Sequence, residues 1–480
     1  MKGGCRFRAI TFLSVLLHYV TFASPLANLP VLVDPMEDLA VRALSPWATR
    51  GGITATDMAH AERHLEGDCR RRPFAWPRCQ PSPMLSSITV INGTSVEGGG
   101  LVGDYIRRAL RTYPHLRPSS NKLVLFVARD SDWPEFPLRE RAHAVPSFAP
   151  QNNGNFFDIL FPTHTRGQFD DNYPKALSSF AAAGAALPWE QRADKAIWRG
   201  AVGCALGCGE RGDLYFPGNH LPRSEQCRDS KSGWDANSMG RNWGCEVGGS
   251  PLWREHERIR LVETSIAAPK TCGLDARVTT LNEHKDFIHR QVGEQVVRSW
   301  MGEHIAEQDL AKWRFAVHVG NNGFADRLWR LLAMGLVVFK VENGWKEFYY
   351  DLLQPWVHYV PVNGSLADLC DKIEWARQNP TESRKIGAAA ARFVQQSLNA
   401  TEVDRYVAHV LRQYQVQLQR GRSATFVDEV SDESSDPLFP AIFALVLVMG
   451  VFCLVRTRRF FCFRPCAMCL AAWPIPKRQE

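Results

Sequence analysis

Apolar runs alternate with polar, glycine-bearing turns most clearly between Trp313 and Asn363. The run from Phe315 to Val319 ends at Gly320-Asn321-Asn322-Gly323, and a helix is expected to begin at about Asp326-Arg327. Two further strands follow at the spacing of strand–helix–strand units. A turn of this kind exposes backbone N–H groups beside the positive end of a helix dipole. The pattern therefore predicts an α/β protein with a phosphate site in this stretch.

The same alternation extends over most of the chain. Buried strands are expected at Leu123–Ala128, Phe157–Phe161 and Ala196–Ala201. Helical periodicity predicts helices at Tyr173–Asp194, His256–Ala267, Leu366–Asn379 (with Ser365 as N-cap), Pro380–Gln395 and Glu402–Leu418. No internal repeat is present, so the pattern indicates core-forming α/β domains.

Residues 1–23 have the pattern of a secretory signal peptide. Lys2, Arg6 and Arg8 precede an apolar run that ends in small residues. An uncleaved signal anchor is the alternative interpretation. Residues 24–72 show a modest helical pattern and are interpreted as a stem.

Residues 438–455 are predicted to form one C-terminal transmembrane helix. The stretch is uncharged over 18 residues, the short end of the range for a bilayer span. Arginines begin the basic tail, residues 456–480, which the positive-inside rule assigns to the cytosol. Residues 421–437 are acidic and poor in apolar side chains, so we expect a flexible stalk there. A GPI signal is the competing interpretation, and the basic tail argues against it.

The net charge of +7 comes from the two ends of the chain. The signal segment carries three cations and the tail a net +5, which leaves the body at −1. A near-neutral body gives no electrostatic support for a nucleic-acid partner.

Cysteines and sequons are consistent with a lumenal body. Eight cysteines lie between the two ends, an even number that suggests disulfides of undetermined pairing. Glycosylation sequons begin at Asn92, Asn363 and Asn399, all on the expected lumenal side. Residues 203–251 hold four of the cysteines and no regular periodicity, so we expect a disulfide-stapled insertion. A zinc site is the alternative, but paired C-x-x-C spacing is missing.

Several motifs in order along the chain resemble glycosyltransferase family 90, specifically its Rumi-like, KTEL-type protein O-glucosyltransferases. They are Trp198-Arg199-Gly200, Arg327-Leu328, Gly335–Lys340, Trp345–Tyr350 and Gln354–Pro361. The resemblance covers about residues 123–415. It implies a GT-B fold, in which two Rossmann-like domains hold a sugar nucleotide in the cleft between them. Residues 73–420 would be the catalytic region, with residues 252–420 mainly the donor-binding half.

The resemblance also implies an inverting, metal-independent transfer of glucose or xylose from UDP-glucose or UDP-xylose, with no cofactor. Asp158, which matches the family's base, would take the acceptor's proton; a surface or capping carboxylate is its alternative role. Arg199 and Gly200 match the family's donor motif, with a structural ion pair as the alternative for Arg199. Arg327 would bind the diphosphate, and the neighbouring donor-binding positions are Asn322, Gly323, Phe324, Ala325 and Asp326.

Four positions depart from the family pattern. Gly320-Asn321 replaces Asp-Gly, Ala325 replaces a serine, and Val202 stands where a second arginine is expected. Asp130-Ser131-Asp132 forms a D-x-D triplet, but the family needs no metal, so we expect no metal site there.

The sequence therefore predicts a glycosyltransferase of the endoplasmic reticulum or Golgi membrane, with its catalytic region in the lumen. Its acceptor would be a hydroxyl of a secretory-pathway protein or of a glycan. A polysaccharide xylosyltransferase of the same family is one alternative. A non-catalytic lumenal glycan- or protein-binding module is the other, motivated by the departures at Gly320, Asn321 and Ala325.

Overall fold

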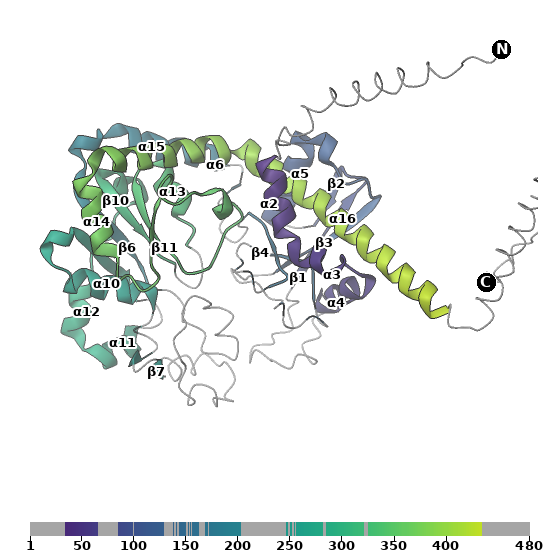
Figure 1. Cartoon of the computed structure of the whole chain (residues 1–480), viewed down its shortest axis with the longest axis horizontal. Coiled ribbons are helices and arrows are strands. Elements are labelled where there is room, and N and C mark those ends of the chain that lie inside the picture. The colour runs from purple at the N-terminus through teal and green to yellow at the C-terminus, as the bar shows by residue number, and fades with distance from the viewer. Residues whose placement is uncertain are drawn as a thin grey trace, which may run out of the picture. The chain divides into compact units, whose positions relative to one another are not determined.

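The computed structural model in Figure 1 describes residues 34–65, 85–98, 100–128, 138, 141, 144–149, 152, 154, 156–162, 169–170, 172–202, 246–247, 250–251, 254, 256–281, 285–320 and 325–433. The predicted signal peptide, transmembrane helix and basic tail lie outside these residues, as does nearly all of the predicted insertion. Within the described ranges, no helix combines the length and the apolar character that a membrane crossing requires.

A parallel sheet of five strands forms the larger α/β layer (Figure 1). Its order is β12 (Val360–Val362), β11 (Val337–Val341), β10 (Trp313–His318), β6 (Ala193–Ala201) and β9 (Leu274–Thr280). Every neighbouring pair is parallel. All of β11 is buried, and every one of its residues except Lys340 is apolar, as is usual for a central strand of a parallel sheet. We call this layer the parallel sheet.

A second, mixed sheet has the strand order β2-β1-β3-β4-β5. β1 (Leu85–Ile91) pairs antiparallel with β2 (Ser95–Glu97) and with β3 (Lys122–Ala128). β3 then pairs parallel with β4 (Ser147–Ala149), and β4 pairs parallel with β5 (Ile159–Leu160). The two sheets and their helices fit the expected Rossmann-like α/β class.

Helices connect the strands of both sheets. They are α5 (Gly100–Thr112), α6 (Tyr173–Ala186), α10 (Glu257–Ala267), α11 (Lys285–Val292), α12 (Glu294–Trp300), α13 (Leu328–Ala333), α14 (Leu369–Gln378) and α15 (Pro380–Ser397). The short elements are β7 (Glu246–Val247), β8 (Ser250–Pro251) and the 3-10 helices η2 (Pro114–Leu116), η4 (Trp189–Gln191), η6 (Lys270–Cys272), η8 (Glu307–Lys312) and η9 (Tyr350–Leu352). α14 begins at Leu369 behind Asp368, three residues later than the expected start at Leu366.

Three helices occupy the region that the sequence assigned to a stem. They are α2 (Pro35–Ala43), α3 (Ser45–Arg50) and α4 (Ala55–Leu65). Trp47 of α3 is fully buried, and its Nε1 donates a hydrogen bond to the backbone oxygen of Phe157 at 2.8 Å. These residues are therefore packed into the folded unit next to β5.

The last described helix, α16 (Ala400–Glu433), is longer than the sequence indicated. It continues beyond the expected end at Leu418 and through part of the predicted stalk. Its first half packs against the mixed sheet, where the Tyr406 hydroxyl donates to the backbone oxygen of Leu160 at 2.7 Å. Asp404 pairs with Arg108 of α5 at 2.7 Å. The chain thus returns to the mixed sheet after completing the parallel sheet.

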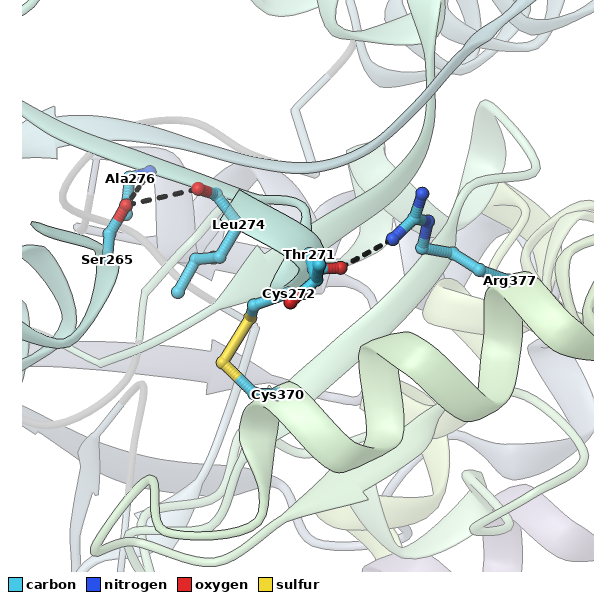
Figure 2. The surroundings of a disulfide bond; sticks show 7 residues. All are labelled: Ser265, Thr271, Cys272, Leu274, Ala276, Cys370 and Arg377. Atoms are coloured by element: carbon cyan, nitrogen blue, oxygen red, sulfur yellow. Dashed lines mark hydrogen bonds between the residues drawn. A yellow bond between two sulfur atoms is a disulfide. The ribbon is translucent and has the colours of Figure 1, made fainter. Parts of the chain in front are cut away.

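A disulfide between Cys272 and Cys370 fastens the parallel sheet to one of its helices (Figure 2). It joins η6, just before β9, to the first turn of α14. Arg377, farther along α14, donates to the backbone oxygen of Thr271 at 2.6 Å and pairs with Asp194 at 3.0 Å. α14 is therefore held to η6 by both a covalent bond and a charged hydrogen bond.

Candidate functional site

The carboxyl ends of the parallel strands collect the polar residues of the candidate site. His318 ends β10, Lys340 is the penultimate residue of β11, and Arg199-Gly200 precede the last residue of β6. In open α/β sheets this edge is where ligands bind, because the loops and helix N-termini that follow the strands gather there. His318 and Lys340 are both buried although both are polar.

Arg327 lies directly beside the end of β6. It is the N-cap residue of α13, and its Nη1 donates to the backbone oxygen of Arg199 at 2.6 Å. Burial lowers the pKa of its guanidinium. A Cβ on Gly200 would lie 2.9 Å from Nη2 of Arg327 and 2.8 Å from the ring of Trp198. Glycine at this position thus makes room for the arginine.

Arg258, in the first turn of α10, supplies a second guanidinium that the sequence analysis missed. Its Nε donates to the backbone oxygen of Gly320 at 2.8 Å, and its Nη1 donates to that of Ala201 at 2.6 Å. Its guanidinium carbon is 5.8 Å from the centre of the Trp198 ring, and that of Arg327 is 5.9 Å away. Trp198 therefore has two arginines over its ring, within cation–π distance.

His318 is kept neutral by these surroundings. Its pKa is well below the ordinary value, first because it is buried and then because Lys340, Arg327 and Arg258 are positive. The hydroxyl of Tyr350 lies 3.5 Å from its Nε2, and its Nδ1 has no hydrogen-bond partner among the residues that the structure describes. Three cations around one neutral imidazole make this edge suitable for an anion.

Two glutamates border the same edge. Glu342 pairs with Lys340 at 2.9 Å. Burial raises the pKa of Glu257 to about 7, although a hydrogen bond from Asn343 and the neighbouring Arg258 favour its charged form. The negative charge close to Arg258 therefore decreases as the pH falls below about 7.

The Arg199 side chain forms an ion pair with Asp275. Its Nη2 lies 2.9 Å from Oδ2 of Asp275 on β9, and its Nη1 lies 3.2 Å from Oδ1. Such a two-pronged pair fixes the guanidinium against the neighbouring strand. The backbone oxygen of Arg199 accepts the hydrogen bond from Arg327.

The remaining predicted donor positions are described only in part. Ala325 is buried, and Asp326 pairs with Arg330 at 3.4 Å. Asn322, Gly323 and Phe324 lie outside the described residues, as do Asp130 and Asp132. Outside those gaps, no group of three or more His, Cys, Asp or Glu residues is arranged to hold a metal ion.

Asp158, the predicted base, precedes β5 and is almost completely buried. The hydroxyl of Ser147, on neighbouring β4, donates to its Oδ1. The side-chain amide of Asn152 donates to its backbone oxygen at 2.7 Å. Ser147 therefore holds the Asp158 carboxyl group from the neighbouring strand.

The segment that holds Asp158 is joined to the loop that follows β11. Asn152 and Lys346 exchange backbone hydrogen bonds of 3.1 and 3.0 Å. The rings of Phe156 and Trp345 are stacked, with centroids 6.3 Å apart. The segment with Asp158 and the loop after β11, the strand that carries Lys340, therefore contact each other directly.

Residues 249–433 match Glycosyl transferase family 90. The chain is 25% identical over 321 residues to Protein O-glucosyltransferase 2 of Danio rerio, covering 66% of this chain and 52% of that protein. It is 28% identical over 158 residues to Protein O-glucosyltransferase 3 of Homo sapiens, covering 33% and 29%. It is also 31% identical over 180 residues to uncharacterized protein 035R of Invertebrate iridescent virus 3, covering 36% and 16%. The chain thus spans about half or less of the length of these relatives.

Proposed function

Because residues 249–433 belong to glycosyltransferase family 90, we propose that this chain is a glycosyltransferase that moves glucose or xylose from a UDP-sugar to a hydroxyl group. The observation that carries the proposal is the cation cluster at the carboxyl ends of the parallel strands. Arg258 and Arg327 flank Trp198 there, next to Lys340 and a neutral His318. A sugar nucleotide brings the diphosphate that this charge would hold.

The two arginines suit a diphosphate because each guanidinium is a planar fork of N–H donors. Both are fixed by backbone oxygens: Gly320 and Ala201 hold Arg258, and Arg199 holds Arg327. Groups fixed before binding need not reorganise when charge builds on the leaving diphosphate. In the proposed mechanism they do the work that a metal ion does in other transferases, so no metal is required.

Asp158 is the proposed base. As the acceptor oxygen attacks the anomeric carbon, the carboxylate takes the hydroxyl proton. The bond from that carbon to the diphosphate oxygen breaks, and UDP leaves with the electron pair. A one-step displacement of this kind inverts the anomeric centre. The Ser147 hydroxyl would keep Asp158 oriented until the proton arrives.

We place the reaction in the lumen of the secretory pathway, with the chain anchored by residues 438–455. The signal-like N-terminus and the sequons support this placement. The Cys272–Cys370 disulfide adds support, because such bonds persist mainly in oxidising compartments. The acceptor would be a hydroxyl on a secretory-pathway protein, a choice favoured by the names of the relatives, or on a glycan.

A donor screen tests the proposal. The full chain is expressed in eukaryotic cells, purified in detergent and incubated with UDP-glucose, UDP-xylose or GDP-mannose, with and without EDTA. We expect transfer or slow hydrolysis with one of the UDP-sugars, unchanged by EDTA, and none with GDP-mannose. Complete inactivity with every donor would contradict the proposal that the chain is an enzyme. Loss of activity with EDTA and its recovery with Mn²⁺ would contradict the metal-free mechanism.

A further inference from the structure

Asn152 contacts both halves of the proposed active site. Its backbone N–H and C=O pair with the backbone of Lys346 in an isolated antiparallel bridge, at 3.1 and 3.0 Å. Lys346 lies in the loop that follows β11, at whose end the cation cluster lies. The side chain of Asn152 is buried and turns the other way, toward the segment that carries Asp158.

Every polar atom of the Asn152 side chain is used within that segment. Its Nδ2 donates to the backbone oxygens of Phe156 at 3.2 Å and of Asp158 at 2.7 Å. Its Oδ1 accepts from the backbone N–H of Gly154 at 2.8 Å. The amide therefore joins Asn152 to Gly154, Phe156 and Asp158, and the last of these is the residue proposed as the base.

We propose that Asn152 is a positioning residue that sets the Asp158 carboxylate relative to the donor half of the site. The proposal rests on the proposed function, because it assigns a geometric role in that reaction. Its backbone fixes the loop to Lys346, and its side chain fixes Asp158 to the loop. The hydrogen bonds of Asn152 thus link the loop after β11 to the backbone of Asp158.

This arrangement gives a specific expectation for the side chain. Asn152→Ala keeps the backbone bridge to Lys346 but removes both donors to the Asp158 segment. Asn152→Asp keeps the acceptor for Gly154 but turns a carboxylate toward two backbone oxygens. In both variants Asp158 is displaced while the arginine cluster keeps its contacts. Misplacing a reacting group by about 1 Å lowers rates by about 100-fold.

The test compares both variants with the wild type for transfer kinetics and for UDP binding by calorimetry. We expect kcat to fall by about 100-fold, with the KM for the UDP-sugar and the Kd for UDP changed less than about 2-fold. Asn379→Ala is the matched control. This change also removes a hydrogen bond from a side-chain amide to a backbone oxygen, that of Trp375 at 2.8 Å, but at the junction of α14 and α15. It should keep the wild-type kcat and lose less thermal stability, because it removes one hydrogen bond and Asn152→Ala removes three.

Two results would overturn the proposal. A wild-type kcat in Asn152→Ala would show that the amide does not position the base. A loss of UDP affinity in step with kcat would show that Asn152 supports the donor half instead. Hydrogen exchange tests the geometry without any activity: residues 156–162 should lose protection in Asn152→Ala and keep it in Asn379→Ala. Normal protection there overturns the positioning role, whereas an inactive wild type overturns only the proposed function.

Discussion

Arg258 and Arg327 lie over the same indole ring, and each donates to backbone oxygens at the ends of β6 or β10. Burying guanidinium groups costs desolvation free energy, and burial lowers the pKa of Arg327. Backbone oxygens and the Trp198 π-face offset part of the cost. A bound diphosphate would offset more of this cost, so we expect ligand binding to stabilise both side chains.

Replacing Arg258 by lysine tests this interpretation. Lysine keeps the charge but loses the planar fork that two backbone oxygens hold in place. We expect UDP affinity to fall by about 10-fold, in line with one lost hydrogen bond to a charged group. Arg298→Lys is the control, because that side chain is 77% exposed on α12. Equal UDP affinity in both variants by calorimetry would exclude Arg258 from the diphosphate site.

Glu257 gives a prediction about pH and stability. Its pKa is raised to about 7 in the folded protein, so between its ordinary range and pH 7 the folded state holds a proton that the unfolded state has lost. Stability from this group is therefore lost as the pH rises toward 7. Glu257→Gln, which never ionises, should gain thermal stability relative to the wild type between pH 5 and pH 8. A constant difference in melting temperature over that range would contradict the raised pKa.

Site residues could be predicted from the sequence where they belong to a motif. They could be predicted less well where their contacts depend on which strands are neighbours. The Arg327 guanidinium and Gly200 lie together, as their motifs suggested. Arg258 was missed because its helix follows the long Cys-containing stretch, and no spacing links it to β6. An ion pair was the alternative for Arg199, but its partner Asp275 could not be named, because β9 had not been recognised as the neighbouring strand.

At the scale of elements, strands that contain an apolar run were predicted, whereas two strands with scattered polar residues, β1 and β9, were not. β3, β10 and β11 appear where apolar runs indicated. β1 (LSSITVI) and β9 (LDARVTT) carry several polar residues, so their own sequence gives a weak signal. Their positions come from pairing with β3 and β6. Propensity cannot reveal that kind of tertiary choice.

The N-terminal helices supply an element-scale prediction. Trp47→Phe removes the donor to the buried backbone oxygen of Phe157, next to Asp158. An unsatisfied buried oxygen costs about 1–3 kcal/mol, so the free energy of unfolding should fall by about that much in denaturant titrations. Trp356→Phe is the control, since Trp356 is 46% exposed. If both variants unfold at the same denaturant concentration as the wild type, α3 does not support the Asp158 segment.

At the scale of the whole molecule, the order of the chain differs from the order of its sheets. β6 belongs to the parallel sheet although it precedes the Cys-containing stretch, so the half with the parallel sheet begins before residue 203. α16 then returns to the mixed sheet, as the contacts of Asp404 and Tyr406 show. The sequence predicted two α/β halves, but not that the half with the mixed sheet contains chain from both sides of the half with the parallel sheet.

The Cys272–Cys370 bond should stabilise this fold measurably. It closes a loop with a sequence separation of 98, and such cross-links typically contribute about 2–4 kcal/mol. The double variant Cys272→Ala/Cys370→Ala should lose stability of that size in denaturant titrations. Cys370→Ala alone should lose about the same, since either change removes the same cross-link. A clearly smaller loss in the single variant would show that packing at Cys272, and not the bond, is responsible.

The central claim is that Asp158 performs the transfer while the arginine cluster binds the donor. The most direct test measures sugar transfer and UDP binding in the wild type and in Asp158→Asn. We predict that the asparagine variant loses transfer by at least about 100-fold while its UDP affinity stays within about 2-fold of the wild type. Transfer at the wild-type rate by Asp158→Asn, with UDP bound equally well, would exclude Asp158 as the base.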